Sequence, residues 1–477
     1  MVINTVGKVV AAEGVLMILP GVVSLAYGEY KTAFWFSVVM TAAIVVGLMA
    51  TYLIKPKSRA YFSKEGFVSV ALAWIVLSLI GALPFVLSGE IPSFIDALFE
   101  TVSGFTTTGA SVIEDVTALS HGALIWRSFT HWVGGMGIIV FVVAFGSKTQ
   151  DRTMHVLRAE MPGPLVDKIV PRSKDTAKIL YLIYVGITAA LFIMLLFGGM
   201  TPFESAIHTF GTVGTGGFGI KPDSLAGYNS FIQWTIAVFM LLCGINFNVY
   251  FLIIIGKIKT ALKSTELRVY LFIILAATVG IAFNVYSTCA GFIDTVKTAF
   301  FQVSSVITTT GFATADFNKW NEASKTILLL LMFIGGSAGS TAGGLKVSRF
   351  ILLIKKIRSG IRHTLNPNTV DVIKFEGKQV DESTVNGVTS YFSIYMIIIS
   401  VIFLLLSFNG FSIETNLSAT VSCFNNIGPG LGVVGPMSSY AAYAPLSKLL
   451  LMAAMLLGRL EIYPLLILVA PSTWFKQ

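Results

Sequence analysis

Hydrophobic residues in this chain gather in long runs that are separated by polar links. The runs at residues 34–54, 180–197 and 449–468 are each long enough to cross about 30 Å of hydrocarbon as a helix. Similar runs recur along the chain and predict ten membrane spans, at residues 8–27, 33–54, 66–88, 124–146, 178–199, 231–256, 269–288, 325–352, 388–408 and 445–469. The expected fold class is therefore an all-α integral membrane protein.

The polar links alternate in charge. Lysines and arginines gather after the second, fourth, sixth and eighth runs, at residues 55–64, 148–174, 257–268 and 355–378, and Lys476 lies near the end of the chain. Basic links stay on the cytoplasmic side of a membrane, so both termini are expected in the cytoplasm. Glu13 and Pro20 interrupt the first run and a second run follows at once, so residues 1–62 are interpreted as a retained hairpin of two spans and not as a cleaved signal.

Composition agrees with a membrane protein. Hydrophobic residues make up 55% of the chain and charged residues 12%, roughly half the charged share of soluble domains, and the mean hydropathy is +0.80. Because the net charge of +9 lies mainly in the links, it predicts contact with membrane lipid and no nucleic-acid partner. Cys243, Cys289 and Cys423 are too widely separated to predict a disulfide framework or a metal site.

A segment rich in glycine and threonine occurs four times, in the links expected outside the cell. Aligned on one glycine, the copies read SGFTTTG, GTVGTGG, SVITTTG and SCFNNIG, and they end at Gly109, Gly217, Gly311 and Gly428. These glycines are 108, 94 and 117 residues apart, which indicates a repeated unit. Each unit is expected to hold a span, a short half-helix, an extended strand and a second span, within residues 63–150, 151–262, 263–380 and 381–477.

Four such strands around one axis would form a central cation pore. Non-helical backbone at membrane depth must face protein or water, and inward carbonyl oxygens can replace the hydration shell of a cation. Glycine allows the backbone angles that align these carbonyls. A single glycine patch is more typical of helix packing, but four copies at matched positions favour a pore. The candidate cation ligands are Thr107, Thr108, Thr215, Gly216, Thr309, Thr310, Asn426 and Ile427.

Small residues interrupt the eighth run. Residues 335–344 include Gly335, Gly336, Gly339, Gly343 and Gly344. Each glycine costs roughly 1 kcal/mol relative to alanine inside a helix, so the helix is expected to break here. A loop below the four strands could then occlude the pore. The alternative is a packing seam of small residues.

Arg459 lies in the middle of the tenth run, two residues before Glu461. A charge at the bilayer centre is costly unless it meets water or a partner. Two interpretations remain open. Arg459 either packs against a carboxylate or backbone carbonyls, or it faces the pore and raises the barrier to permeation.

Other polar residues are weaker candidates. Arg127 and His131 could brace the first strand or touch only the rim of the pore. His208 stands in the half-helix position that Glu100 occupies in the first unit, which favours a scaffold role over a ligand role. Three acidic residues could concentrate cations at the outer mouth or form a solvated face: Glu100, Glu204 and Asp294.

These segments resemble the Trk/Ktr/HKT superfamily of potassium transporters over essentially the whole chain. SGFTTTGA, TGGF, TTTGFA and NNIGPGLG are similar to the four filter segments of that family, in order. WVGGMGIIVF at residues 132–141, FIGGSAGSTAGGLKVSR at 333–349 and LGRLEIYPLL at 457–466 are similar to its other characteristic stretches. The N-terminal hairpin favours the bacterial Trk type over the shorter Ktr type.

The resemblance implies potassium uptake by a gated, channel-like pore, with no enzymatic activity and no organic cofactor. It implies that Gly109, Gly217, Gly311 and Gly428 are the filter glycines, and that the loop at residues 335–344 and Arg459 form the gate. Plant relatives that admit sodium carry serine at the first filter position, so Gly109 favours potassium. The fourth filter departs from the threonine pattern with Asn425-Asn426-Ile427, which loosens any expectation of strict four-fold coordination.

The resemblance also implies partners and a location. It predicts a homodimer in the bacterial inner membrane and a separate cytosolic, nucleotide-binding regulatory subunit similar to TrkA. The basic link at residues 355–378 could dock that subunit or anionic lipid. The nearby stretch GGSAGSTAGGLKVS lacks the Gly-Lys-Ser/Thr of a phosphate-binding loop, so this chain is not expected to bind the nucleotide itself.

Two other classes of function remain as alternatives. A secondary transporter that couples potassium or sodium to another ion needs a buried carboxylate near the midplane, and Glu461 is the sequence candidate. A membrane enzyme needs a nucleophile–base pair or a metal constellation, and the spans offer no such set.

Overall fold

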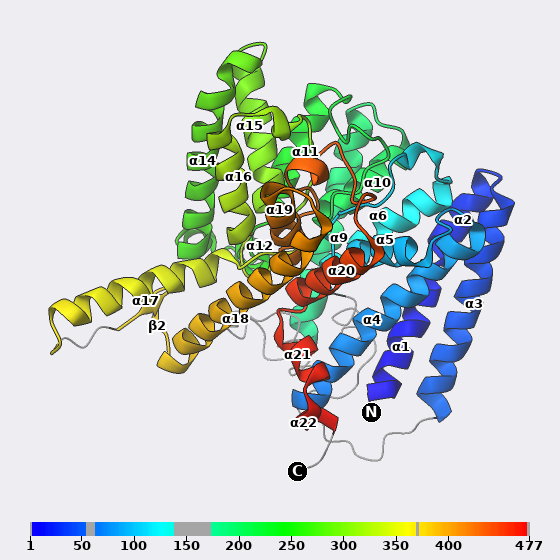
Figure 1. Ribbon diagram of the computed structural model, residues 1–477, viewed down its shortest axis with the longest axis horizontal. Helices are drawn as coiled ribbons and strands as arrows, with labels where there is room; N and C mark the ends of the chain where they lie inside the picture. The colour runs from blue at the N-terminus through cyan, green and yellow to red at the C-terminus, as the bar shows by residue number, and fades with distance from the viewer. Residues whose placement is uncertain (1, 54–62, 138–172, 369–371, 475–477) are drawn as a thin grey trace.

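The computed structural model describes residues 2–53, 63–137, 173–368 and 372–474, and these parts of the chain are almost entirely helical (Figure 1). Two short strands, β1 (Lys374–Phe375) and β2 (Lys378–Gln379), pair antiparallel in a small hairpin. The predicted all-α class is confirmed.

The N-terminal hairpin packs along one side of the molecule. Helices α1 (Val2–Leu16) and α2 (Ile18–Ala26) run in one direction and α3 (Tyr30–Leu53) returns beside them. A Cβ added to Gly47 would lie within 2.5 Å of the Gly7 carbonyl oxygen, so α1 and α3 are in backbone contact, as small residues allow between membrane helices. Glu29 fixes the hairpin to the first unit, because its carboxylate accepts the His121 backbone N–H at 2.8 Å.

Each of the four predicted units contains a long helix, a short helix and a second helical segment. The long helices are α4 (Ser63–Ser88), α9 (Ser173–Phe197), α14 (Thr265–Val285) and α18 (Glu382–Leu406). The short helices are α5 (Phe94–Phe105), α10 (Pro202–Val213), α15 (Phe292–Ile307) and α19 (Ile413–Phe424). The segments that follow begin with α6 (His121–Gly135), α11 (Ser230–Cys243), α16 (Glu322–Ile334) and α20 (Pro445–Arg459).

Further helices extend the second, third and fourth units. These are α12 (Phe247–Ile254), α13 (Ile258–Leu262), α17 (Val347–Leu365), α21 (Tyr463–Val469) and α22 (Pro471–Trp474). Single turns of tighter helix lie at Val116–Ala118, Tyr286–Thr288, Phe317–Lys319, Ser407–Asn409 and Gly432–Val434. Helix α17 projects from the body together with α18 (Figure 1).

Side-chain caps define where three of the four short helices begin. The hydroxyls of Ser93, Thr201 and Ser412 each accept a backbone N–H from the first turn of α5, α10 and α19, the interaction that makes serine and threonine strong N-caps. Thr201 and Glu204 complete a reciprocal capping box. All four short helices end on a buried apolar residue, so their C-terminal ends lie inside the protein: Phe105, Val213, Ile307 and Phe424.

Within the described residues, six of the ten predicted spans are helices long and apolar enough to cross a membrane: Val2–Ala26, Tyr30–Leu53, Lys64–Ser88, Lys178–Phe197, Thr265–Thr288 and Glu382–Asn409. The span predicted at 231–256 is bent, because α11 and α12 meet at an angle of 91°. The span at 445–469 is also not continuous, since α20 ends at Arg459 and α21 begins at Tyr463. The expected break in 325–352 is confirmed between α16 and α17. The end of the span at 124–146 lies outside the described residues.

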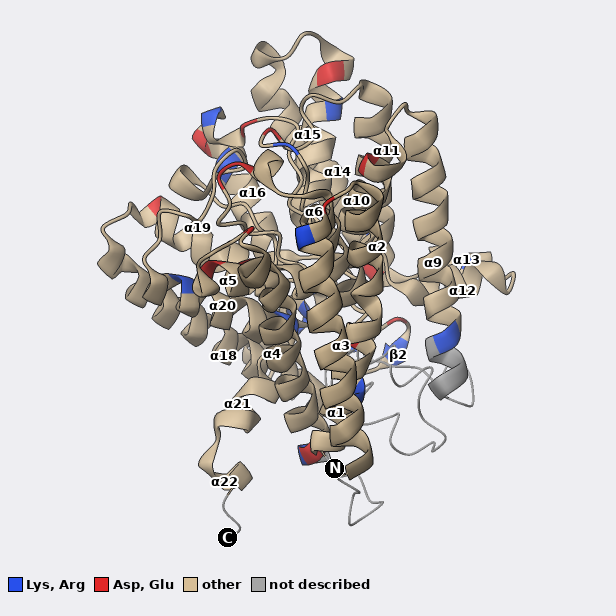
Figure 2. Cartoon of the chain, turned by 90° about the vertical axis from the view of Figure 1, so that its right-hand side faces the viewer, with Lys and Arg blue, Asp and Glu red and all other residues tan. Residues whose placement is uncertain are grey.

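Lysine, arginine, aspartate and glutamate positions are few along the helices that Figure 2 shows. On α3 and α4 they are confined to the first turns, at Lys31, Lys64 and Glu65. Large apolar side chains are exposed instead, including Phe34, Phe197 and Phe283. An apolar belt with charge at its borders is the surface that a bilayer requires. Most lysines and arginines of the links at 55–64 and 148–174, and Lys476, lie outside the described residues.

Candidate ion pathway

Each short helix ends in the same non-helical turn, here called a glycine turn: residues 106–109, 214–217, 308–311 and 425–428. The residue before each glycine donates its backbone N–H to the carbonyl five residues earlier, at 2.8–2.9 Å. The four bonds run from Thr108 to Ser103, Gly216 to Gly211, Thr310 to Ser305 and Ile427 to Ser422. In all four turns, the residue two positions before the glycine donates its backbone N–H to the carbonyl three residues earlier. This pair of bonds is the Schellman motif that ends many helices.

The residue that makes this turn is never glycine. Thr107, Thr215 and Thr309 each have φ of 55°, and Asn426 has φ of 57°. Left-handed backbone is tolerated by asparagine but is a clear outlier for the β-branched threonine, and such strain persists only where the surrounding structure enforces it. Four matched left-handed residues on four helices, three of them strained threonines, therefore mark these turns as a functional feature.

The key glycines pack in a ring. Gly109, Gly217, Gly311 and Gly428 have φ between 78° and 98°, in the region that side chains rarely adopt. A Cβ added to each would overlap or crowd a carbonyl oxygen of the next unit: Gly109 that of Gly216, Gly217 that of Thr310, Gly311 that of Ile427, and Gly428 that of Thr108. The contacts run from unit one to two, three, four and back to one, so the four turns surround a single axis.

Buried oxygen atoms line the turns. Thr107, Thr108, Thr215, Thr309 and Thr310 are completely buried. The hydroxyl of Thr107 and the amide oxygen of Asn426 have no hydrogen-bond partner among the described residues. Within those residues no group of three or more His, Cys, Asp or Glu side chains could hold a metal ion. The oxygens available to an ion here are therefore uncharged carbonyls, hydroxyls and an amide.

Side-chain bonds make the ring asymmetric. Thr106 bonds Thr108 at 2.7 Å through their hydroxyls, and Thr308 bonds Thr310 in the same way at 2.8 Å. The fourth turn has no such pair. There the Asn426 Nδ2 group donates to the Thr108 hydroxyl at 3.0 Å and to a carbonyl of α20. Asparagine thus ties the fourth turn directly to the first.

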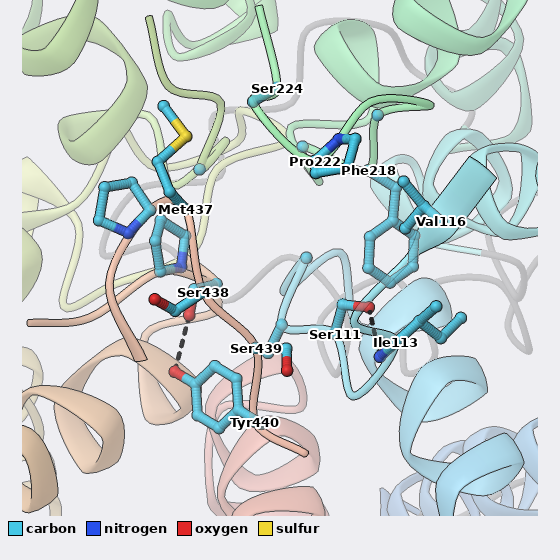
Figure 3. Close-up of a pocket in the computed structure, with 18 of the residues that line it drawn as sticks. Ser111, Ile113, Val116, Phe218, Pro222, Ser224, Met437, Ser438, Ser439 and Tyr440 are labelled. Carbon is cyan, nitrogen blue, oxygen red and sulfur yellow. Dashed lines mark hydrogen bonds between the residues drawn. The ribbon is translucent and has the colours of Figure 1, made fainter. Parts of the chain in front are cut away.

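On one side of the ring lies a cavity of about 280 Å³ that all four key glycines line. Figure 3 shows part of its wall, with Met437, Ser438 and Tyr440 on one side and Ser111, Ile113 and Val116 on the other. The Tyr440 hydroxyl donates to the Gly428 carbonyl at 2.7 Å, and its backbone N–H donates to the Ser111 carbonyl at 2.8 Å. The fourth and first units are therefore joined on this side of the ring as well.

Arg127 and Glu100 brace the first turn from within the protein. Both side chains are buried, and Arg127 lies 3.5 Å from the Glu100 carboxylate. Glu100 accepts the Val112 backbone N–H at 3.1 Å, while the guanidinium of Arg127 lies 4.1 Å from the Phe218 ring of the second unit. Of the two interpretations of Arg127, bracing fits this geometry better than a rim contact.

His131 and His208 are both fully buried scaffold residues. His131 Nδ1 lies 2.9 Å from the Gly104 carbonyl, and its ring packs against Gly216. His208 contacts the Tyr228 hydroxyl at 3.4 Å, and Tyr228 in turn donates to Glu204 at 2.9 Å. Glu204 thus takes part in a hydrogen-bonded brace, and Asp294 pairs with Lys297 at 3.0 Å.

On the other side of the ring lies the segment that interrupts the eighth run, residues 335–346, here called the inner loop. Gly335 packs on Gly343 and Gly344, so the two ends of the loop touch. The Gly343 N–H donates to the Thr309 hydroxyl of the third glycine turn at 2.7 Å, and Gly343 also packs on the Asn425 carbonyl of the fourth. The inner loop therefore lies directly against two of the four turns.

Arg459 ends α20 beside this loop. Its guanidinium donates to the Thr341 carbonyl of the inner loop at 3.0 Å and to the Gly134 and Gly135 carbonyls at the end of α6. It also lines a cavity of about 70 Å³ with Gly339, Gly343 and Gly344. Arg459 therefore binds backbone carbonyls, as the first interpretation expects, and it also lines an internal cavity.

Glu461 does not pair with Arg459. Its carboxylate binds Arg349 of α17, and the Arg349 guanidinium lies 4.2 Å from the Tyr391 ring. Glu461 and Ile462 have φ of 55° and 67°, and they form the bend between α20 and α21. The hydrophobic residues on both sides of Arg459 and Glu461 concealed that bend.

The break between α11 and α12 was also missed from the sequence. It consists of Gly244, Ile245 and Asn246, and the Asn246 side chain caps α12 by accepting the Asn248 N–H at 2.9 Å. A glycine followed by an asparagine N-cap is a recognisable stop and start signal. The hydrophobic residues on both sides of this signal led instead to the prediction of a single span.

Comparisons with known proteins agree with this architecture. A family model described as TrkH, a cation transport protein, matches residues 34–477. The Trk system potassium uptake protein TrkH of Escherichia coli is 37% identical over 479 residues and covers 98% of each chain. TrkG of the same organism is 34% identical over 483 residues, covering 99% of this chain and 98% of its own. The crystal structure of the potassium transporter TrkH from Vibrio parahaemolyticus superposes with a TM-score of 0.89 at 33% identity, covering 99% of both chains.

Proposed function

The chain belongs to the TrkH family of cation transport proteins, and we propose that it takes up potassium through a gated pore formed by the four glycine turns. The cyclic contact of the four key glycines is the observation that carries this proposal. Its relatives in Escherichia coli are named potassium uptake proteins. Buried, uncharged oxygens around one axis suit a large monovalent cation that has shed its water.

The ion is bound by oxygens of the two residues that precede each glycine. These ligands are Thr107 and Thr108, Thr215 and Gly216, Thr309 and Thr310, and Asn426 and Ile427. Each short helix points its C-terminal end at the ring, so the negative end of its dipole adds to the attraction for a cation. The asymmetry around Asn426 makes the fourth unit contribute differently from the others.

The inner loop and Arg459 form the gate. The loop, with Gly335, Gly336, Gly339, Gly343 and Gly344, lies against the third and fourth glycine turns, and Arg459 holds its tip through the Thr341 carbonyl. A positive charge beside the ion path also repels a cation until the loop moves. These contacts support a closed conformation.

The remaining proposals concern the assembly. The chain forms four pore units, at residues 63–150, 151–262, 263–380 and 381–477, after an N-terminal hairpin, and works as a homodimer in the bacterial inner membrane with both termini cytoplasmic. A cytosolic, nucleotide-binding subunit similar to TrkA regulates it. The projecting helix α17 supports this docking, since it carries Lys355, Lys356, Arg358 and Arg362.

Conduction fits the described residues better than coupled transport. Glu461, the carboxylate that a coupled mechanism would use, is bound to Arg349. No catalytic role is proposed, because the family is one of transporters.

The test is electrical. Purified protein in otherwise empty liposomes should carry a potassium current that reverses at the potassium equilibrium potential, at every pH tested. A reversal potential that follows the proton or sodium gradient would instead indicate coupled transport. Absence of any potassium current from folded protein would refute the proposal as a whole.

A further inference from the structure

The inner loop is seated on the break between α11 and α12. The Ser337 N–H donates to the Gly244 carbonyl at 2.9 Å, and the Phe247 N–H donates to the Gly339 carbonyl at 3.0 Å. The Thr341 hydroxyl donates to the Cys243 carbonyl at 3.2 Å. A break in a helix leaves backbone groups without their usual partners, and at membrane depth such groups need protein partners. Here the backbone N–H and carbonyl groups left unpaired at the two helix breaks form hydrogen bonds with one another.

One carboxylate joins the parts of this seat. Glu266, in the first turn of α14, is only 5% exposed. Its Oε1 atom accepts the Ala338 N–H of the inner loop at 2.8 Å and the Ser348 N–H of α17 at 3.2 Å. Its Oε2 atom accepts from the Asn246 side chain, at the α11–α12 break, at 3.5 Å. Glu266 therefore contacts the tip of the loop, the helix that follows the loop, and the break that receives it.

The charge of Glu266 suits this place. Ser348 lies in the first turn of α17, where the helix dipole favours a negative group. Hydrogen bonds to a charged acceptor are stronger than neutral ones. The N-terminus of α14 does not need Glu266 as a cap, because Ser264 caps it by accepting the Leu267 N–H at 3.3 Å. Glu376 also accepts the Thr265 N–H at 3.1 Å and the Glu266 N–H at 3.0 Å. The Glu266 side chain is thus free to bind the loop.

The loop is consequently held on two faces. Thr309 and Arg459 hold it on the side of the glycine turns, and Glu266 holds it on the side of the α11–α12 break. We propose that Glu266 is a positioning residue that keeps the inner loop seated on the α11–α12 break, and that the strength of this hold sets the balance between the closed and open pore. This inference rests on the proposed gating role of the loop.

The test compares three variants of the full chain in liposomes that contain no other protein. Glu266→Ala removes both acceptor oxygens, whereas Glu266→Gln keeps one oxygen at the position that faces Ala338 and Ser348. Glu382→Ala is the matched control, because Glu382 is an exposed first-turn carboxylate on α18. Potassium flux should rise about tenfold in Glu266→Ala, which is about 1.4 kcal/mol in the closed–open equilibrium. It should rise less in Glu266→Gln and stay unchanged in the control.

A second measurement reports how accessible the inner loop is to a reagent in water. Ser340 lies at the loop tip and lines the 70 Å³ cavity, so Ser340→Cys, placed in a Cys289→Ser background, can be modified by a water-soluble thiol reagent. Its modification rate should rise with the flux in Glu266→Ala and less so in Glu266→Gln. The potassium-to-sodium permeability ratio should not change, because the glycine turns are untouched.

Two results would overturn the role of Glu266. One is wild-type flux and wild-type modification rates in folded Glu266→Ala and Glu266→Gln. The other is a change of flux accompanied by loss of ion selectivity, which would show a general structural role. If Glu266→Ala fails to fold, Glu266→Gln alone decides by the same criteria.

The proposed gate is tested separately by deleting residues 337–342. The deletion can be closed because the ends of the loop touch at Gly335 and Gly344. If it raises flux while both Glu266 variants behave as wild type, the gate stands and the role of Glu266 fails. If the deletion leaves flux unchanged, the gate itself fails.

Discussion

The glycine turns and the inner loop are both short non-helical segments buried in the protein, but they are held differently. Each glycine turn is closed by bonds to its own helix, within six residues. The inner loop is bound mainly by distant elements, with partners such as Glu266 and Arg459 that lie 72 and 118 residues away in the sequence. Local bonds make four copies of one rigid shape. Long-range bonds can be exchanged when helices move, which suits a gate.

The ring should be the part least tolerant of change. Gly217→Ala places a Cβ on backbone with φ of 79° and onto the Thr310 carbonyl. Such strain costs on the order of 1–3 kcal/mol, and relieving it displaces a ligand carbonyl. We expect potassium flux in liposomes to fall more than about 100-fold, since each 1.4 kcal/mol corresponds to about tenfold.

Gly186→Ala is the matched control for that substitution. Gly186 belongs to α9 of the same unit, and an added Cβ there would meet no atom within 4 Å. Its flux should equal that of the wild type. Equal flux in both alanine variants would show that the ring is not the ion path.

The inner loop should respond in the opposite direction. Arg459→Ala removes the guanidinium that binds the Thr341, Gly134 and Gly135 carbonyls and the positive charge beside the cavity. Hydrogen bonds to a charged group contribute about 1.5–3 kcal/mol, so flux through purified protein should rise about tenfold or more. Arg459→Lys keeps the charge and should show a smaller rise. Unchanged flux in folded Arg459→Ala would remove the barrier role.

The contact between the two regions can be measured with a matched pair of threonines. Thr309→Val removes the acceptor of the Gly343 N–H, whereas Thr107→Val removes an equivalent hydroxyl that has no partner among the described residues. A hydrogen bond contributes about 1 kcal/mol, so the flux ratio of Thr309→Val to Thr107→Val should be a few-fold above one. A ratio of one would mean that this bond does not hold the loop.

The sequence predicted the locally determined parts well. The four segments aligned on their glycines, two of which share SxxTTTG, placed the key glycines and the short helices, because each turn depends on residues within its own helix end. The glycine-rich stretch at 335–344 predicted the break in the eighth run for the same reason. The Schellman geometry and the left-handed threonines were not foreseen, since threonine rarely adopts that conformation.

The long-range parts were missed. Nothing near Glu266 in the sequence indicates that it binds a loop 72 residues away. The bend after Gly244 was hidden because hydrophobic residues continue on both sides of it, and hydrophobicity reports burial in lipid and not straightness. Arg459 was assigned to the middle of a helix for the same reason, although it is the last residue of α20.

In the proposed pore, backbone oxygens of the four glycine turns replace water around a passing potassium ion. The most direct measurement is the potassium-to-sodium permeability ratio of the wild type beside Gly109→Ser, in liposomes under bi-ionic conditions. The wild type should prefer potassium, and the serine, whose Cβ would overlap the Gly216 carbonyl, should lower the ratio toward one. An identical ratio in both proteins would show that the oxygens of the glycine turns do not select the ion.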